Sequence, residues 1–423
     1  MLQLNIIHDD PKRVVELLRI KNFDAEALVG EIRDLDRKRR ETQKKLDDGL
    51  AEANSLAKEI GKLFKSGRGD EANALKEKTA TIKKETQALG SELEEIKSAL
   101  EEKLVLLPNI PHPTVPSGTS EKDNEVVELK DFAVKLAEDA LPHWDLAKKY
   151  DIIDFDLGSK VTGAGFPFYK NQGARLQRAL INFFLDEALK AGYEEYQPPL
   201  FVNEDSAYGT GNLPDKEGQM YYIGEDKLYA IPTAEVPITN IYRDVILGRD
   251  QLPIRNAAYS NCFRREAGSY GKHVRGLNRL HQFDKVEIVQ ICHPDQSYDV
   301  LEEMRNYVAS LLKKLELPYR ILKLCGGDIS FTSALTYDFE VYSAAQKRWL
   351  EVSSVSNFEA FQSNRMKLRF RDEDGKTRLA HTLNGSALAL PRIVAALLEN
   401  MQSEDGIAIP AVLQDYTGFK HIS

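Results

Sequence analysis

Apolar positions recur mostly at intervals of three, four or seven from about residue 28 to residue 100. The first run is Leu28, Ile32, Leu35, Leu46, Ala53, Leu56, Ile60 and Leu63, and the second is Leu75, Ile82, Leu89, Leu93, Ile96 and Leu100. A seven-residue repeat is typical of helices that pack along one apolar seam. Because the turn signal SGRGD at 66–70 separates the runs, the pattern predicts an antiparallel helical hairpin, a coiled-coil arm over about 28–104. A dimerising coiled coil is the alternative.

A Pro-rich stretch, LLPNIPHPTVPSG at residues 106–118, follows the predicted hairpin. We expect it to be an extended linker between an N-terminal domain at 1–105 and a second domain at 119–423. In the second domain, helical apolar stripes are expected at 173–192 and 298–317. Strands are expected at 193–202, at 336–361 as a pair joined around Ala345 and Gln346, and at 383 onward, leading into a helix. The predicted fold class is α+β, with an antiparallel sheet flanked by helices.

Composition narrows the class of protein further. The chain has 423 residues, a formal charge of −9 and only three cysteines, which form no CxxC pair. Neither a zinc site nor a disulfide framework is expected. The N-terminus lacks the character of a signal peptide, and no apolar run reaches the ~18 residues that span a bilayer, so we expect a cytoplasmic protein without membrane contact. The negative net charge argues against a protein whose whole surface is basic and binds nucleic acid. Between Lys58 and Lys84, however, basic residues outnumber acidic ones.

The stretch FRREAGSYGKHVRGLNRLHQFDKVEIV at 263–289 reads as a strand hairpin with an unusual face. Alternation places Arg264 and Glu266 on one face of the first strand, and Phe283 and Glu287 on one face of the second. Arginine binds phosphate and an aromatic ring stacks on a purine, so a nucleotide site is predicted. A solvent-exposed face with surface ion pairs is the alternative. The loop 269–273 is the expected moving part.

Three further segments carry candidate ligands. IPTAEVPI at 231–238 reads as a strand with Thr233 and Glu235 on one face, suited to a small molecule with an ammonium group. EVSSVSN at 351–357 offers Glu351 and Ser354 as oxygen ligands for Mg²⁺, although a spacing of three requires a bulge or a bridging water. LNGSALALPR at 383–392 offers Asn384, Ser386 and Arg392. VTGAGFPF at 161–168 completes no GxGxxG and is interpreted as a turn.

Together these segments resemble a class II aminoacyl-tRNA synthetase, and specifically the bacterial type of the seryl-tRNA synthetase family. GYEEYQPPLFV resembles motif 1, FRREAGSYGKHVRGLNRLHQFDKVE motif 2 and NGSALALPR motif 3, while PTAE and EVSS are typical of the seryl enzymes. One departure is visible, since Ala387, Ala389 and Pro391 stand where motif 3 is usually glycine-rich. The resemblance implies that L-serine and ATP form seryl-adenylate and pyrophosphate, and that serine then passes to the 3′ end of tRNA(Ser).

The resemblance also implies roles for individual residues. Arg264, Glu266 and Arg392 would be catalytic, holding the α-phosphate, the adenine side and the γ-phosphate of ATP. The implied ATP site comprises Arg264, Arg265, Glu266, Phe283, Glu351, Val352, Ser353, Ser354 and Arg392, with Mg²⁺ on Glu351 and Ser354. The implied L-serine site comprises Thr233, Ala234, Glu235, Glu287, Asn384 and Ser386.

Partners follow from the same resemblance. The hairpin would bind the long arm of tRNA(Ser), and possible contacts are Lys62, Lys65, Arg68, Lys76 and Lys83. A homodimer is implied, and tRNA(Sec) is a further implied substrate. Two rivals are a paralogue that loads a small amino acid onto a carrier protein and an inactive paralogue that only binds tRNA. The arm argues against the first, and the complete set of charged motif residues argues against the second.

Overall fold

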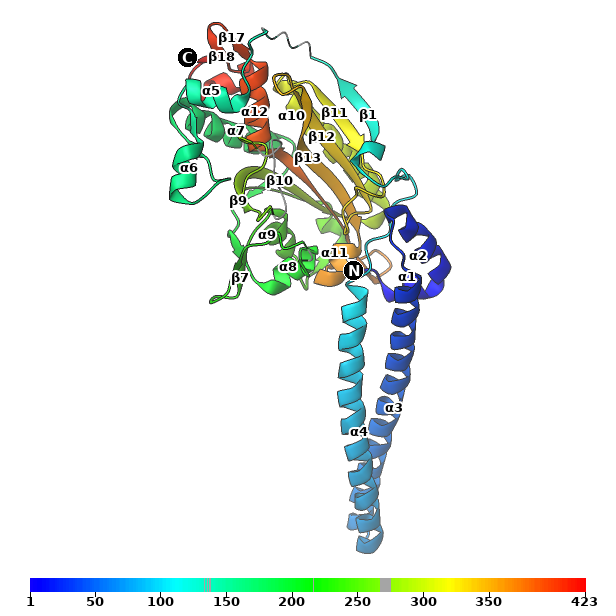
Figure 1. Ribbon diagram of the computed structural model, residues 1–423. Helices are drawn as coiled ribbons and strands as arrows, with labels where there is room; N and C mark the ends of the chain where they lie inside the picture. The colour runs from blue at the N-terminus through cyan, green and yellow to red at the C-terminus, as the bar shows by residue number, and fades with distance from the viewer. Residues whose placement is uncertain (133, 135, 137, 216, 267–274) are drawn as a thin grey trace. The chain divides into compact units, whose positions relative to one another are not determined.

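The computed structural model describes residues 1–423 except 133, 135, 137, 216 and 267–274 (Figure 1). The chain divides into two compact units. One comprises Leu2–Arg19 and Phe23–Pro108, and the other comprises Met1, Ile20–Asn22 and Asn109–Ser423. Within the described residues, no helix is both long enough and apolar enough to cross a membrane.

The first unit is entirely helical. Its elements are α1 (Leu4–Asp9), α2 (Pro11–Leu18), α3 (Glu26–Lys65) and α4 (Gly69–Leu104). Helices α3 and α4 lie antiparallel and side by side, which confirms the predicted hairpin (Figure 1). The Asp10 carboxylate caps α2 by accepting a hydrogen bond from the Arg13 N–H at 2.9 Å. Helix α1 was not predicted from the sequence.

The seam of the arm has a strict seven-residue period that the apolar pattern revealed only in part. On α4, five buried residues follow one another at intervals of seven: Ala72, Thr79, Thr86, Leu93 and Leu100. The threonines satisfy their hydroxyls locally, since Thr79 donates to the Leu75 carbonyl at 2.7 Å. A Cβ on Gly49 of α3 would lie 2.7 Å from the Thr86 methyl group, so the two helices approach closely there.

The second unit contains an eight-stranded sheet. Its strands, in spatial order, are β1 (Glu125–Lys130), β11 (Tyr319–Lys323), β12 (Leu335–Ser343), β13 (Arg348–Glu359), β16 (His381–Ala389), β10 (Gln282–Cys292), β9 (Ile254–Phe263) and β4 (Glu194–Tyr196). All neighbours are antiparallel except β4 and β9. The predicted α+β class with an antiparallel sheet is therefore confirmed.

Helices cover this sheet and bury one continuous apolar core. The main ones are α7 (Asn171–Lys190), α10 (Ser297–Lys314) and α12 (Leu390–Asn400), whose apolar residues join Val286, Ile288 and Leu280 in the core. The remaining helices are α5 (His143–Lys149), α6 (Phe155–Val161), α8 (Glu204–Thr210), α9 (Glu235–Asn240), α11 (Phe361–Met366) and α13 (Ala411–Thr417).

Short strands form four minor sheets. These are β2 (Ile153–Asp154) with β3 (Phe168–Tyr169); β5 (Phe201–Val202), β7 (Leu228–Ala230) and β6 (Tyr222–Ile223); β15 (Thr377–Leu379), β14 (Arg369–Arg371) and β8 (Ile246–Gly248); and β17 (Gln402–Ser403), β18 (Gly406–Ala408) and β19 (His421–Ile422). The stretch 106–118 is packed from Asn109 onward, where backbone N–H groups of Asn109 and His112 donate to Phe331 and Ala334 at 2.9 Å.

Two local predictions were wrong. Residues 231–238 do not form a strand, because α9 begins at Glu235 and carries Pro237 in its first turn, a position where proline is tolerated. The Thr233 hydroxyl accepts from the Glu235 N–H at 3.3 Å and stabilises the preceding turn. Strand β9 also ends at Phe263, short of Arg264 and Glu266. The Arg265 N–H donates to the Gln219 carbonyl and not to the partner strand, and Glu266 has a positive φ of 49°, outside the strand conformation.

Candidate active site

A cluster of buried polar side chains, called the acidic pocket below, lies where β10 passes the segment before α9. Glu287 on β10 accepts a hydrogen bond from the Thr233 hydroxyl at 3.1 Å. The Lys285 ammonium, on the same strand face, lies 2.5 Å from the Glu287 carboxylate. Ser386 on β16 pairs directly with Glu287, and Asn384 pairs with Val289, so both share the Glu287 face. The structure therefore brings Thr233, Glu287, Ser386 and Asn384 together as predicted residues of one pocket.

The second carboxylate of this pocket, Glu235, is the first residue of α9. The Gln362 amide of α11 donates to it at 2.6 Å, and the Gln362 amide oxygen accepts from the Thr382 hydroxyl at 2.7 Å. Burial, and then the charge of Glu287, raise the pKa of Glu235 to about 7. Sequence reasoning missed Gln362, and no motif surrounds it. Lys285, which lies between Phe283 and Glu287 in the sequence, was assigned no role.

The end of β9 carries the cationic side of the site. The Arg264 guanidinium lies 5.3 Å from the centroid of the Phe283 ring, and its Nε donates to the Pro232 carbonyl at 3.4 Å. It lies near enough to Glu235 to lower the pKa of that carboxyl group, against the larger effects of burial and Glu287. Arg264 thus joins the acidic pocket to an aromatic ring. Ala234, between Thr233 and Glu235, is fully buried.

Two other residues of the predicted ATP site lie at the edge of the described structure. The Glu266 carboxylate is paired with Arg279, and the Arg265 backbone N–H donates to the Gln219 carbonyl at 2.8 Å. The loop 269–273, expected from the sequence to be the moving part, lies outside the described residues.

Strand β13 contains the bulge that its candidate metal ligands require. Ser353 pairs with Phe339 and Glu351 with Glu340, so Val352 is an extra residue opposite β12. Ser354 pairs with Asp338. Because Glu340 and Asp338 are two apart on a regular strand, Glu351 and Ser354 lie on one face despite their spacing of three. The bulge also orients Ser353, whose hydroxyl donates to the Ser386 carbonyl at 2.6 Å.

Asp338 is an acidic residue of this face that sequence reasoning missed. Burial, and then the charge of Glu351, raise the pKa of Asp338 well above its usual value. Its Oδ1 atom is buried and has no hydrogen-bond partner among the described residues. A buried carboxylate oxygen beside Glu351 and Ser354 provides an oxygen-rich donor set suited to a hard cation such as Mg²⁺. In the described part of the chain, no group of three or more His, Cys, Asp or Glu side chains forms a complete metal cage.

Arg392 stands beside this acidic face, near the start of α12. Its Nη1 donates to the Glu351 carbonyl at 2.7 Å and its Nε donates to the Asn278 carbonyl at 3.1 Å. Strand β16 runs through Ala387 and Ala389 to the helix, with Pro391 in the first turn of α12. Where motif 3 departs from a glycine-rich sequence, β16 still leads directly into α12, but its pairing with β10 is irregular between Ser386 and Ala389, and the Ala387–Leu388 peptide bond is cis.

Comparisons with known proteins agree along the whole chain. A family model described as tRNA synthetase class II core domain (G, H, P, S and T) matches residues 222–401, and one described as Seryl-tRNA synthetase N-terminal domain matches residues 1–111. The serine–tRNA ligase of Salinibacter ruber is 53% identical over 100% of this chain and 99% of its own length. That of Prosthecochloris aestuarii is 45% identical, also over 100% of this chain and 99% of its own.

Solved structures give the same answer. The crystal structure of seryl-tRNA synthetase from Pyrococcus horikoshii complexed with ATP is similar with a TM-score of 0.92 and 35% identity, over 100% of this chain and 99% of that one. A cytoplasmic serine–tRNA ligase from Naegleria fowleri in complex with AMP has a TM-score of 0.87 and 25% identity over the same shares.

The mainly antiparallel sheet, the core-domain match and the full-length relatives together identify the chain as a class II aminoacyl-tRNA synthetase. The core-domain match covers both residues, Arg264 and Arg392. Within that class, the chain belongs to the seryl-tRNA synthetase family.

Proposed function

We propose that this protein is a serine–tRNA ligase, which activates L-serine with ATP and transfers serine to the 3′ end of tRNA(Ser). The observation that carries the proposal is the pocket of Thr233, Glu287 and Ser386 beside Arg264. A pocket with two carboxylates and several hydroxyls matches a small substrate that bears both an ammonium and a hydroxyl group. The full-length similarity to serine–tRNA ligases supports it.

Serine binds with its ammonium group between Glu235 and Glu287. Thr233 places the amino acid, with the neighbouring Ala234 closing the wall, while Asn384 and Ser386 lie near the substrate hydroxyl. A site that hydrogen-bonds a hydroxyl rejects analogues that lack it, because the buried polar groups would lose their partners. Lys285 compensates the charge of Glu287, and Gln362 orients Glu235 through its hydrogen bond.

ATP binds along Arg264, Phe283 and Arg392. Arg264 holds the α-phosphate, where negative charge develops as the serine carboxylate attacks. Phe283 stacks on adenine, Arg265 and Glu266 bind the adenine side, and Arg392 holds the γ-phosphate. The Pyrococcus relative is complexed with ATP, which supports ATP as a ligand of this protein.

Mg²⁺ fits the face formed by the bulge in β13. Glu351 and Ser354 would hold it, Asp338 would offer a further oxygen ligand, and Val352 and Ser353 supply the backbone that sets the geometry. A small number of protein oxygens suits an ion that takes its other ligands from phosphate and water. When bound, this ion neutralises charge on the leaving pyrophosphate.

The first reaction demands positioning rather than proton transfer. The serine carboxylate attacks the α-phosphorus in line with the departing pyrophosphate, and the new P–O bond forms as the bond to pyrophosphate breaks. Glu235 and Glu287 fix the amino acid, while Arg264 and Arg392 fix the two ends of the triphosphate. The ribose hydroxyl at the tRNA 3′ end then attacks the seryl carbonyl carbon and releases AMP.

The arm binds tRNA(Ser) through the exposed residues Lys62, Lys65, Arg68, Lys76 and Lys83. All five lie in solvent, as sequence-independent contacts to phosphate require. Arg68 is also paired with Glu71, and the Lys76 ammonium lies 4.5 Å from the centre of the Phe64 ring. A homodimer, charging of tRNA(Sec) and a cytoplasmic location remain part of this proposal. The carrier-protein paralogue and the inactive paralogue are not favoured.

Exchange of labelled pyrophosphate into ATP tests the proposed activity. We expect exchange that depends on serine, is far weaker with threonine because of its extra methyl group, and is absent with glycine. Failure of every amino acid to support exchange would refute the enzyme assignment.

A further inference from the structure

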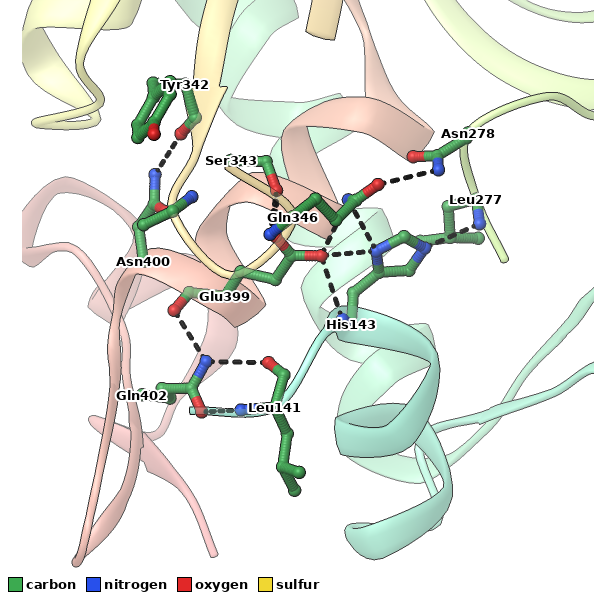
Figure 2. A network of polar contacts seen from close by, with 11 residues as sticks. Leu141, His143, Leu277, Asn278, Tyr342, Ser343, Gln346, Glu399, Asn400 and Gln402 are labelled. Atoms are coloured by element: carbon green, nitrogen blue, oxygen red, sulfur yellow. Dashed lines mark hydrogen bonds and ion pairs between the residues drawn. The ribbon is translucent and has the colours of Figure 1, made fainter. Parts of the chain in front are cut away.

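A buried polar network joins α5, α12 and the segment that precedes β10 (Figure 2). His143, the first residue of α5, and Glu399 on α12 are both fully buried. The His143 Nδ1 atom lies 2.7 Å from the Glu399 carboxylate, and the His143 backbone N–H donates to the same oxygen at 3.0 Å. None of the roles proposed above uses this pair.

The second ring nitrogen of His143 defines its protonation. Nε2 accepts the Leu277 backbone N–H at 2.8 Å, so this nitrogen carries no proton. Nδ1 must then carry the proton and donate it to Glu399, which makes the ring neutral. Although burial opposes it, hydrogen bonding from His143 holds the pKa of Glu399 below its ordinary value. The pair therefore joins an ionised carboxylate to a backbone N–H through one imidazole ring.

The segment that His143 holds is 275–278, which precedes β10. Gly276 has a φ of +68°, and a Cβ there would lie 2.2 Å from His143 Nε2, so only glycine permits this approach. Arg275 also contacts α5, with its guanidinium 4.8 Å from the centre of the Trp144 ring. His143 and Trp144 at the N-terminal end of α5 thus hold residues 275–278 in place.

Asn278 connects the contact between α5 and residues 275–278 to Arg392. Its side-chain amide donates to Gln346 at 2.9 Å, and Gln346 donates in turn to Glu399 at 2.8 Å (Figure 2). Its backbone carbonyl accepts from Arg392 Nε at 3.1 Å. Since Glu351 accepts from Nη1, two carbonyl groups fix the plane of the guanidinium. A planar fork held in this way keeps a fixed direction for its remaining N–H donors.

We infer that His143 is a positioning residue for ATP, which acts by holding 275–278 against α5 and so places the carbonyl that orients Arg392. This inference rests on the proposed role of Arg392 in binding the γ-phosphate. His143 touches no substrate. Its effect is to hold the guanidinium before ATP arrives, which lowers the cost of ordering it on binding.

Two substitutions of His143 separate positioning from simple packing. The amide of glutamine reaches the place of Nε2 and still accepts the Leu277 N–H, whereas the amide of asparagine reaches only the place of Nδ1. His143→Gln therefore keeps the contact to 275–278, and His143→Asn keeps the contact to Glu399 and loses the other. His293→Asn is a matched control, because His293 is also a buried histidine of this unit and lies 5.1 Å from Phe370 in a separate core cluster.

The experiment is pyrophosphate exchange by the full-length protein, with KM measured separately for ATP and for serine and with thermal unfolding recorded for each variant. We expect His143→Asn to raise the KM for ATP on the order of tenfold, His143→Gln to raise it by less than threefold, and both to leave the KM for serine within twofold. His293→Asn should lower the melting temperature without changing either KM.

Equal KM values for ATP in the two His143 variants would overturn the inference, and so would a parallel rise in the KM for serine. If His143→Asn does not fold, Gln346→Met tests the next link to Arg392. It removes the side-chain support of Asn278 and the Gln346 contacts to Glu399 and His143, while both partners of the His143–Glu399 pair remain. It should raise the KM for ATP alone, and an unchanged value would again overturn the inference. Absence of exchange in the unaltered protein would instead refute the proposed function.

Discussion

The Lys285 ammonium lies 2.5 Å from the Glu287 carboxylate, and the two side chains are only 7% and 3% exposed. The pair is thus a buried ion pair in the floor of the predicted serine pocket. Glu287 has a compensating charge, whereas Glu235 has the neutral amide of Gln362 as its hydrogen-bond partner. The two carboxylates of one pocket therefore have different electrostatic environments.

Replacing Lys285 with methionine should destabilise the protein. The substitution leaves Glu287 buried without its counter-charge, which typically costs about 3–5 kcal/mol. Urea denaturation should show this loss in the free energy of unfolding. The double variant Lys285→Met with Glu287→Gln should lose less, because no uncompensated charge remains. A double variant less stable than Lys285→Met would contradict the ion-pair explanation.

Serine binding should strengthen as pH rises through about 7. Burial and Glu287 raise the pKa of Glu235 to about 7, so this carboxyl group is mostly neutral at pH 6 and mostly ionised at pH 8. Only the ionised form attracts the serine ammonium, which stays protonated over this range. The KM for serine in pyrophosphate exchange should therefore fall between pH 6 and 8. Glu235→Gln should bind serine weakly with a flat profile, and a wild-type profile in that variant would exclude Glu235 as the titrating group.

Arg264→Ala should slow pyrophosphate exchange by a factor on the order of 10²–10³, by analogy with the loss of one donor to a developing negative charge. The change should appear mainly in kcat, because the charge on the α-phosphate grows in the transition state. Arg249→Ala is a suitable control, since Arg249 pairs with Asp372 away from the predicted site. A loss smaller than tenfold in the Arg264 variant would argue against the α-phosphate role.

Shortening the arm should separate activation of serine from charging of tRNA. Gly49 and Thr86 adjoin across the hairpin, so residues 50–85 can be replaced by a short glycine-rich turn without stretching the chain. This deletion removes all five predicted tRNA contacts and keeps Asp36, which pairs with His8 at 2.6 Å near the base of the arm. Exchange should stay within threefold of the full chain, while aminoacylation of tRNA(Ser) falls below detection. Normal aminoacylation by the shortened protein would rule out the arm as the tRNA-binding element.

The sequence predicted the arm well because a seven-residue period survives even where single positions are polar. Thr79 and Thr86 occupy the seam although neither looks apolar, and the surrounding leucines were sufficient. Five strands of the large sheet, β4, β10, β12, β13 and β16, were predicted for the same reason, since alternation is local, whereas β1 and β11 were not predicted. The prediction of a strand at 231–238 was wrong. Ile231, Thr233 and Glu235 alternate as in a strand, but Glu235 begins helix α9, whose first turn tolerates Pro237.

The supporting residues could not be predicted, because their partners are distant in sequence. His143 and Glu399 are separated by 256 positions, and Gln362 and Glu235 by 127. Each is a common residue type in an ordinary helix, and only tertiary packing gives it a partner. The motif residues were identifiable by family resemblance, whereas the residues that orient them have no signature of their own.

The bulge at Val352 makes the predicted cation-binding face depend on the number of residues in this part of β13 more than on the identity of the side chain at Val352. It resets the phase of alternation along β13, so that Glu351 and Ser354 share a surface that regular pairing would deny them. Loss of a single codon at this point would turn the upstream end of the strand over and point Glu351 to the opposite side. Most single substitutions at Val352 would preserve the phase. This part of the protein should therefore tolerate point changes far better than insertions or deletions.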